Sequence, residues 1–405
     1  MSWDKVTLGD IASNIQTGPF GSQLHQSDYS LSGTPVVMPK DLSEGRISET
    51  SIARVSDDHV NRLSRHKIEV GDILYSRRGD VGRCAYATET EKGWLCGTGC
   101  LRVTIDAKKA NAKFVFYQLQ KPDTVGWVEK HAIGATMLNL NTSILSNVPV
   151  ILPSLETQER IAGILSAYDN LIENNRKQIR LLEEAARRLY KEWFVDFRFP
   201  GHESVSIIDG VPEGWNKTKL EDVITFNPYV SLDKNRNKQC VPMSALSINC
   251  MTLDASQFTE TKSNSGAKFQ NNDTLLARIT PCLENGKTAF VSGIKSSEGA
   301  VGSTEFIVMR SKELNPYMVY CLARTENFRT IAINSMTGSD GRQRAQVDKL
   351  KAIDYLLPPQ NIIALFSSVS EPMFNQAHVK NVQIESLSQA RNCLLPMLMS
   401  GELEF

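Results

Sequence analysis

Apolar residues recur in alternating steps of four and three along residues 152–194, near the middle of the chain. We call this row of positions the first seam, and its members are Ile161, Leu165, Tyr168, Ile172, Asn175, Ile179, Leu182, Ala186, Leu189 and Trp193. Heptad spacing of this kind predicts one long helix that needs a partner helix. About 38 helical residues at ~1.5 Å each would extend roughly 55 Å, so we expect a spacer.

The residues on either side of the seam predict where this helix begins and ends. Leu152-Pro153 is typical of a stop followed by a helix start, and Glu156 and Glu159 supply an acidic first turn. We expect Pro200-Gly201 to close the far end of the helix.

The second half of the chain repeats the first. A shift of 205 residues carries Leu152-Pro153 onto Leu357-Pro358, and the opening at 3–10 recurs at 215–222 with the same Trp-to-Leu and Trp-to-Asp spacing. A two-fold relation between halves brings self-complementary seams together, so we expect two antiparallel helices. The same shift gives the second seam as Phe366, Ser370, Met373, Ala377, Lys380, Ile384, Leu387, Arg391, Leu394 and Leu398.

Lys380 repeats the position of Asn175 near the middle of the seams. One interpretation is a central polar layer that fixes the register of the two helices. The other is a frayed or partly solvated position, and the sequence leaves both open.

The rest of each half, about 1–150 and 205–355, is divided into short apolar segments by Gly, Asn, Asp and Pro. Asn111 and Asn315 each precede a helical pattern, and Pro316 occupies the favoured first helical position. The predicted fold class is α+β, with two repeated α+β domains separated by two long antiparallel helices that form a coiled coil. The expected segments are 1–151, 152–200, 201–356 and 357–405. The expected strands are Ile68–Val70, Ile73–Ser76, Cys84–Ala87, Leu101–Ile105, Thr274–Ala277, Thr288–Val291 and Phe306–Met309.

Composition is that of an ordinary soluble protein, with 41% hydrophobic and 22% charged residues. No apolar run approaches the ~18 residues that span a bilayer, and no signal peptide is recognisable, so a cytoplasmic location is expected. The eight cysteines are scattered. Cys96 and Cys100 lack a second Cys or His pair downstream, which favours buried free thiols over a metal site. The formal charge of zero gives no reason by itself to expect nucleic-acid binding.

No catalytic or cofactor motif is complete. Gly97-Thr98-Gly99 lacks the third glycine of a dinucleotide loop, and the 283–287 segment lacks the first glycine and the Ser/Thr of a phosphate loop. Asn227-Pro228-Tyr229 lacks one proline of an amino-methyltransferase signature, and the six histidines form no His-Glu-x-x-His motif. We therefore expect no catalytic residue, no metal and no cofactor on this chain.

Basic residues instead gather in polar loops that follow the predicted strands of both halves. Arg can bridge guanine O6 and N7, and Gln can do the same for adenine. A basic cluster is more often only a solvated surface, but its repetition after the strands of both halves favours DNA contact. The candidate DNA-binding residues are Arg77, Arg78, Arg83, Arg278, Lys287, Arg342, Gln343 and Arg344.

These motifs together resemble the specificity (S) subunit of type I restriction-modification enzymes over essentially the whole chain. The segments that carry the resemblance are LPSLETQERIAGILSAYDNLIENN and RLYKEWFVDF of the first helix, GPFGSQLHQSDY, GDILYSRRGDVGR, DTLLARITPCLENGKTAFV, GSTEFIVMR and GSDGRQR.

The resemblance implies a non-catalytic subunit that reads a bipartite DNA sequence. It makes 1–151 and 201–356 the two target-recognition domains, and makes 152–200 and 357–405 the conserved helices. It also implies docking of two methyltransferase (M) subunits on those helices, then of restriction (R) subunits. S-adenosylmethionine, ATP and Mg would be bound by these partners, and the outer face of the first helix (Arg176, Lys177, Arg180, Glu183, Glu184, Arg187, Arg188) would be a docking surface.

Two alternatives remain at this point. An unrecognised DNA methyltransferase or nuclease would require a methyl-donor loop or carboxylate cluster that the sequence does not show. A coiled-coil scaffold would have globular ends that bind protein, and sequence-independent DNA binding by the complete complex would favour it.

Overall fold

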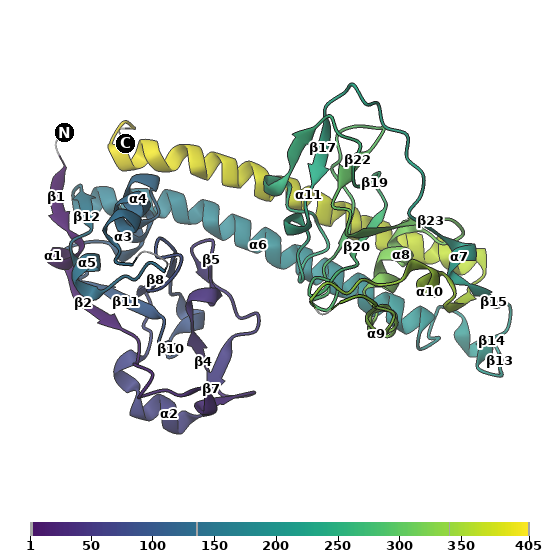
Figure 1. Cartoon of the computed structure of the whole chain (residues 1–405), viewed down its shortest axis with the longest axis horizontal. Coiled ribbons are helices and arrows are strands. Elements are labelled where there is room, and N and C mark those ends of the chain that lie inside the picture. The colour runs from purple at the N-terminus through teal and green to yellow at the C-terminus, as the bar shows by residue number, and fades with distance from the viewer. Residues whose placement is uncertain (1–2, 135–136, 340, 404–405) are drawn as a thin grey trace. The chain divides into compact units, whose positions relative to one another are not determined.

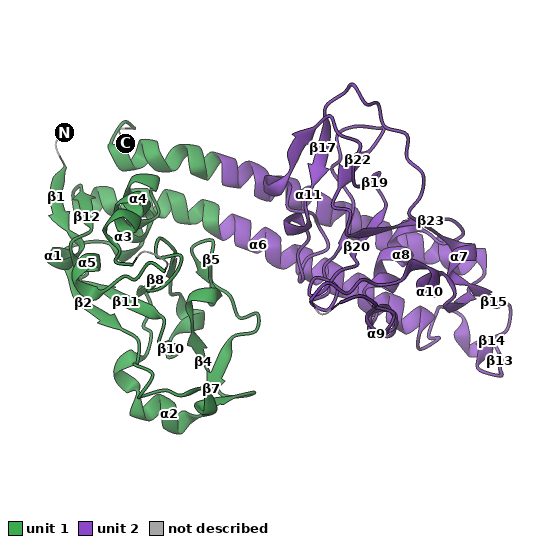
Figure 2. Cartoon of the chain, in the orientation of Figure 1, with its two compact units in different colours: residues 1–169, 390–405 green, residues 170–389 purple. Residues whose placement is uncertain are grey.

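A computed structural model describes residues 3–134, 137–339 and 341–403. Contacts divide the chain into unit 1, Met1–Asp169 with Ala390–Phe405, and unit 2, Asn170–Gln389 (Figure 2). Each unit therefore combines a globular part with a stretch of both long helices. The four segments expected from the sequence remain a prediction, and Asp340 of the GSDGRQR motif lies outside the described residues.

The two long helices are α6 (Leu155–Phe194) and α11 (Gln360–Ser400), both labelled in Figure 1. The expected end of α6 at Pro200 is wrong, because the helix stops six residues earlier. The amides of Val195 and Asp196 both donate to the Lys191 carbonyl, at 3.0 and 2.9 Å, which breaks the helical pattern. Phe197 then adopts a left-handed φ of 56° and turns the chain away.

The helices run antiparallel in both units. In unit 1, Ile161 and Leu165 near the start of α6 share a core with Leu398 near the end of α11. In unit 2, the rings of Trp193 and Phe194, at the end of α6, lie 5.8 and 5.1 Å from that of Phe366, near the start of α11. Every position of both seams is buried or half-buried. The predicted fold class is confirmed.

The globular part of unit 1 contains two four-stranded sheets. The first, in the order β2-β11-β8-β9, is antiparallel throughout; the second, β10-β4-β7-β3, contains the parallel pair β10·β4. Their strands are β2 (Ala12–Thr17), β11 (Cys100–Ile105), β8 (Ile73–Ser76), β9 (Cys84–Tyr86), β10 (Leu95–Cys96), β4 (Thr34–Val37), β7 (Ala53–Val55) and β3 (Tyr29–Ser30).

Unit 2 repeats this arrangement, with the orders β16-β23-β20-β21 and β18-β17-β22-β19 and the parallel pair β17·β22. Its strands are β16 (Ile224–Phe226), β23 (Phe306–Ser311), β20 (Thr274–Ala277), β21 (Thr288–Phe290), β18 (Thr259–Thr261), β17 (Lys238–Val241), β22 (Ala300–Gly302) and β19 (Ala267–Phe269).

A further strand pair precedes each long helix. β1 (Asp4–Thr7) pairs with β12 (Pro149–Leu152), and β15 (Asn216–Lys219) pairs with β24 (Asp354–Leu357), both antiparallel. The opening of each repeat thus holds the strand that leads into α6 or α11. The remaining short strands are β5 (Leu42–Ser43), β6 (Arg46–Ile47), β13 (Ile207–Ile208) and β14 (Val211–Pro212).

Equivalent short helices cover equivalent positions in the two units. The Asn111 side chain accepts the Phe114 amide at 3.0 Å, and the Asn315 side chain accepts the Met318 amide at 2.8 Å. Both predicted helix starts are therefore confirmed. The helices are α1 (Leu8–Ile11), α2 (Asp57–Arg62), α3 (Ala112–Leu119), α4 (Pro122–His131) and α5 (Thr142–Ser146), then α7 (Leu220–Val223), α8 (Pro316–Ala323), α9 (Glu326–Asn334) and α10 (Val347–Lys351).

Six of the seven predicted strands match strands of the structure, with differences of at most two residues at their ends. The predicted strand Ile68–Val70 is wrong. Residues 69–72 form a turn in which the Asp72 amide donates to the Glu69 carbonyl at 3.1 Å and Gly71 takes a φ of 91°. Ile68 is apolar because it is buried in the core, which explains why its sequence pattern was misleading.

Candidate nucleic-acid interface

The candidate residues of each unit lie in loops at one end of its antiparallel sheet, where neighbouring strands stop. In unit 1, β2 and β8 flank β11 and both run antiparallel to it, so Thr17 and Ser76 end at the same edge. In unit 2, β16 and β20 flank β23 in the same way. We call these ends of the two sheets, with the loops that follow the strands there, the recognition edges of units 1 and 2. Loops at such an edge are held by a rigid sheet, as binding loops commonly are.

Arg77 and Arg278 occupy equivalent positions just after β8 and β20. The Arg77 amide donates to the Gly99 carbonyl at 2.8 Å, and the Arg278 amide donates to the Glu305 carbonyl at 2.9 Å. Their own carbonyls accept the amides of Leu140 and Ala345, each at 2.8 Å. The backbone of both arginines is thus held by hydrogen bonds to two neighbouring segments of the chain.

Both strand-end arginines keep a donor without a partner. The buried Nε atoms of Arg77 and Arg278 make no hydrogen bond to the described residues. The guanidinium of Arg77 lies 5.8 Å from the centre of the Phe20 ring, which is 53% exposed. Both side chains are half-buried, and their Nε atoms are shielded from solvent, so any contact with DNA would come from the outer Nη groups.

The other candidates after β8 and β20 differ in how free their side chains are. Arg78 is exposed. The Arg83 guanidinium donates to the Asp80 carboxylate at 2.7 Å, so its charge is partly offset. The Lys287 ammonium donates to the Met243 carbonyl at 3.0 Å. Lys287 therefore supports its own chain, which weakens it as a DNA contact.

The loop at 337–344 brings three more candidates to the recognition edge of unit 2. Arg342 is exposed, whereas the Gln343 carbonyl accepts the Thr280 amide at 3.0 Å. Arg344 binds the Glu305 carboxylate through Nε and Nη2, at 2.9 and 2.7 Å. Glu305 is a residue that sequence reasoning missed, because nothing in its local pattern marks a partner 39 positions away.

Sequence reasoning also missed the counterpart of this loop in unit 1. Ile133 pairs with Asn139 by a backbone bridge, as Thr337 pairs with Arg344. The shift of 205 that relates the seams carries Asn139 onto Arg344, so this signal was present in the sequence. Residues 135–136 of the loop lie outside the described residues.

A cleft of about 320 Å³ lies beside β2 in unit 1, lined by Ile15, Gln16, Thr17, Arg65, His66 and Thr142. The Arg65 Nε donates to the His66 Nε2 at 3.0 Å, so a neutral ring carries its proton on Nδ1. Burial, with help from Arg65 and Arg102, lowers the pKa of His66 to about 4. The His66 ring is therefore uncharged at pH 7, and its role is structural.

The long helices carry polar anchors as well as apolar seams. Glu183, expected on the outer face of α6, is 4% exposed and its carboxylate accepts the Tyr320 hydroxyl at 2.7 Å. Arg324 approaches the same carboxylate at 3.2 Å. The outer-face expectation is therefore wrong for Glu183, because α8 covers that side of α6 in unit 2. Asn175 is buried and Lys380 is half-buried.

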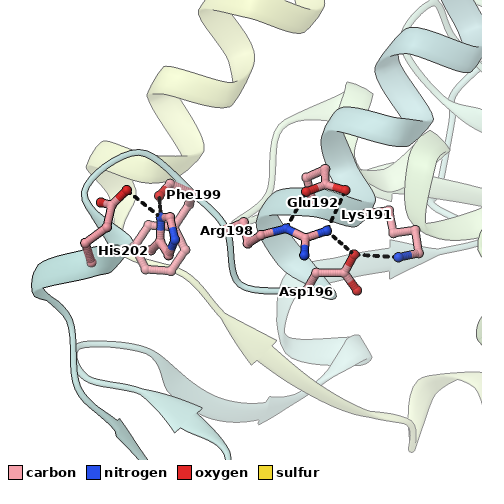
Figure 3. A network of polar contacts seen from close by, with 7 residues as sticks. Lys191, Glu192, Asp196, Arg198, Phe199 and His202 are labelled. Atoms are coloured by element: carbon pink, nitrogen blue, oxygen red, sulfur yellow. Dashed lines mark hydrogen bonds and ion pairs between the residues drawn. The ribbon is translucent and has the colours of Figure 1, made fainter.

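The segment that follows α6 is held by a network of ion pairs. Figure 3 shows the Arg198 guanidinium between Glu192 and Asp196, with Lys191 on the far side of Asp196. Arg198 donates to both Glu192 oxygens at 2.5 and 2.8 Å and approaches Asp196 at 3.2 Å. These contacts lower the pKa of both carboxyls, of Glu192 through Arg198 and of Asp196 through Lys191. The network closes the helix and fixes the turn that follows it.

Chemistry outside these edges is sparse. Within the described ranges, no three His, Cys, Asp or Glu side chains gather in a way that could hold a metal ion. Cys96 and Cys100 are buried, and burial raises the pKa of Cys96 to about 12. No helix in the described part of the chain is long and apolar enough to cross a membrane.

These features define a class of protein built from two repeated α+β units on paired helices. Residues 1–184 match the family model described as the type I restriction modification DNA specificity domain. The chain as a whole is similar to type I restriction enzyme specificity subunits.

Several members of that family are similar along their whole length. The MjaIX specificity subunit of Methanocaldococcus jannaschii is 25% identical over 99% of this chain and 93% of its own length. The HindI specificity subunit of Haemophilus influenzae is 20% identical over 99% of both chains. The crystal structure of a type I S subunit from M. genitalium has the same fold, with a TM-score of 0.57 and 16% identity over 98% of this chain and 96% of that one.

Proposed function

We propose that this chain is the non-catalytic subunit that gives a type I restriction-modification complex its DNA sequence specificity. Each unit reads one half of a bipartite target through its recognition edge. The observation that carries this proposal is the equivalence of Arg77 and Arg278, each held by backbone hydrogen bonds at the end of its strand and each half-buried at its recognition edge. An arginine fork at a strand end suits the O6 and N7 acceptors of guanine in the major groove.

The partners in this proposal are double-stranded DNA, two M subunits and, through the complex, R subunits. S-adenosylmethionine, ATP and Mg belong to those partners, and the complex works in the cytoplasm. The M subunits dock on the exposed face of the long helices. Supporting this, α6 exposes both charged side chains and the large apolar residues Leu171 and Leu181, which are 52% and 55% exposed. Among the charged residues predicted for the outer face of α6, Lys177, Arg180, Glu184, Arg187 and Arg188 are exposed.

Mapping the adenines that become methylated in cells carrying the chain with its M subunits tests this function. The expected result is one bipartite sequence with two specific halves and unread bases between them, centred about one helical turn apart. Methylation without sequence preference would contradict it and would favour a scaffold. Methylation by the purified chain alone would instead establish an enzyme.

A further inference from the structure

The Arg344 side chain at the recognition edge of unit 2 is held in one orientation by Glu305. The carboxylate takes the Nε and Nη2 hydrogens at 2.9 and 2.7 Å, side-on to the fork. The Nη1 of Arg344 makes a long contact of 3.5 Å to the Arg342 carbonyl. The hydrogen bond from Arg344 also lowers the pKa of Glu305, so the carboxylate is charged at neutral pH.

The backbone of Arg344 is fixed as firmly as its side chain. Its amide donates to the Thr337 carbonyl at 2.9 Å, and its carbonyl accepts the Thr337 amide at 3.1 Å. The Gln346 side chain donates to the Arg344 carbonyl at 3.0 Å and to the Thr337 hydroxyl at 2.6 Å. Little freedom is left for this side chain to lose on binding, which favours affinity and selectivity.

The donors of the guanidinium show what remains for a ligand. Arginine has five N–H donors in a planar fork. Glu305 takes two and the Arg342 carbonyl takes one, so one Nη1 and one Nη2 hydrogen remain at the end of the fork. The side chain is 42% exposed. Two parallel donors on one planar end match the O6 and N7 acceptors of guanine.

We propose that Glu305 is a positioning residue that holds Arg344 as a pre-formed reader of one guanine in the half-site of unit 2. The inference rests on the proposed function and makes it more specific. Unit 1 has Gly99 and Asn139 at the positions equivalent to Glu305 and Arg344. Unit 1 therefore lacks a carboxylate-held fork at this position.

The test is enrichment of bound sequences from randomised double-stranded DNA by the full chain in complex with its M subunits. Wild type is compared with Glu305→Gln, which removes the carboxylate charge, and with Arg344→Lys, which keeps the charge but loses the fork. Asp354→Asn is the matched control, because it removes one carboxylate on β24 from an exposed ion pair with Lys219 of β15. In a second arm, 7-deazaguanine replaces the required guanine and tests the wild-type protein directly.

The wild-type complex is expected to require a G·C pair at one position of the unit 2 half-site. Glu305→Gln and Arg344→Lys should both reduce the preference for that same G·C pair, by roughly 5- to 150-fold. Both should leave the preference at the other half-site unchanged. Loss of the guanine N7 should weaken wild-type binding at that position, and Asp354→Asn should keep the wild-type sequence.

Three results would overturn the inference: no required G·C pair in that half-site, an unchanged preference in Glu305→Gln, or relaxation of different base pairs by the two variants. If either variant fails to fold, tolerance of 7-deazaguanine by wild type overturns it independently. A wild-type complex that enriches no sequence would contradict the proposed function itself, which is a distinguishable outcome.

Discussion

The Arg391 guanidinium of α11 donates to the Asp169 carboxylate of α6 at 2.7 Å, so an ion pair joins the two long helices within unit 1. The other carboxylate oxygen accepts the Tyr117 hydroxyl of α3 at 2.6 Å. Arg391 is a charged position of the second seam. In the structure it is a polar link among three helices.

Asp169→Ala should destabilise unit 1, because it leaves the half-buried Arg391 charge without its partner. The expected loss is about 1–3 kcal/mol, below the range for a fully buried pair since Arg391 is 30% exposed. Denaturant unfolding measures this loss. Glu184→Ala, which breaks an exposed pair with Arg188 on the same helix, should cost at most about 0.5 kcal/mol. If both variants lose the same small free energy of unfolding, the ion pair between Asp169 and Arg391 adds no more stability than an exposed pair.

Glu183→Ala should cost more than Asp169→Ala. Glu183 and Arg324 have side chains only 5% and 8% exposed, and Tyr320 loses its acceptor at the same time. Removing one partner of such a buried pair costs about 3–5 kcal/mol. Thermal unfolding of the variant, compared with Glu184→Ala, measures the effect, and a melting temperature unchanged from wild type would contradict the buried contact.

The stability of the folded chain should fall as the pH drops from about 6.5 towards 4. The folded pKa of His66 is about 4, whereas an unfolded histidine titrates near 6.5, so the unfolded state binds the extra proton in this window. One such proton lowers the free energy of unfolding by at most about 1.4 kcal/mol for each pH unit in this window. His66→Gln should reduce the slope between pH 4 and 6.5, as followed by urea unfolding at several pH values. An identical slope in wild type and variant would rule out His66 as its source.

Arg342→Ala should weaken or relax recognition at the half-site of unit 2 by ~1–3 kcal/mol and leave the other half untouched. Arg342 is exposed in the loop at 337–344. Arg78→Ala, which changes an exposed arginine at the recognition edge of unit 1, should affect the opposite half-site. Competition binding with single-base variants of the target distinguishes the two. A uniform loss across all sequences would instead mark Arg342 as a phosphate contact.

DNA binding should be weak for the free chain and stronger when M subunits are bound, because the chain has a formal charge of zero. A salt titration of both forms measures the affinity and the number of phosphate contacts. Equal affinity and equal salt dependence would count against a contribution from the M subunits.

The repeat was the most informative feature of the sequence. The positions of both seams, the helix starts at Asn111 and Asn315, and the strands before Arg77 and Arg278 were all predictable, because heptad spacing, caps and short β-rich segments are local signals. The strand expected at 68–70 and the expected end of α6 were wrong, because burial and backbone contacts outweighed the local sequence pattern at both places.

The partners of the candidate side chains were not predictable. Lys287 donates to Met243, 44 residues away, and Arg344 binds Glu305, 39 residues away. Such pairs depend on which strands become neighbours, and no spacing rule along the chain encodes that. The sequence therefore located the recognition edges but did not distinguish free arginines from engaged ones.

The contribution of α11 to unit 1 has a consequence for synthesis on the ribosome. Leu398 and Met399 are 2% and 1% exposed within a core that also contains Leu8 and Phe114. Translation makes residues 3–169 first, but the apolar surface that covers this part of the core emerges almost 400 residues after the first strand. The half that is translated first is therefore completed last, and until then its open core is a natural binding site for a chaperone.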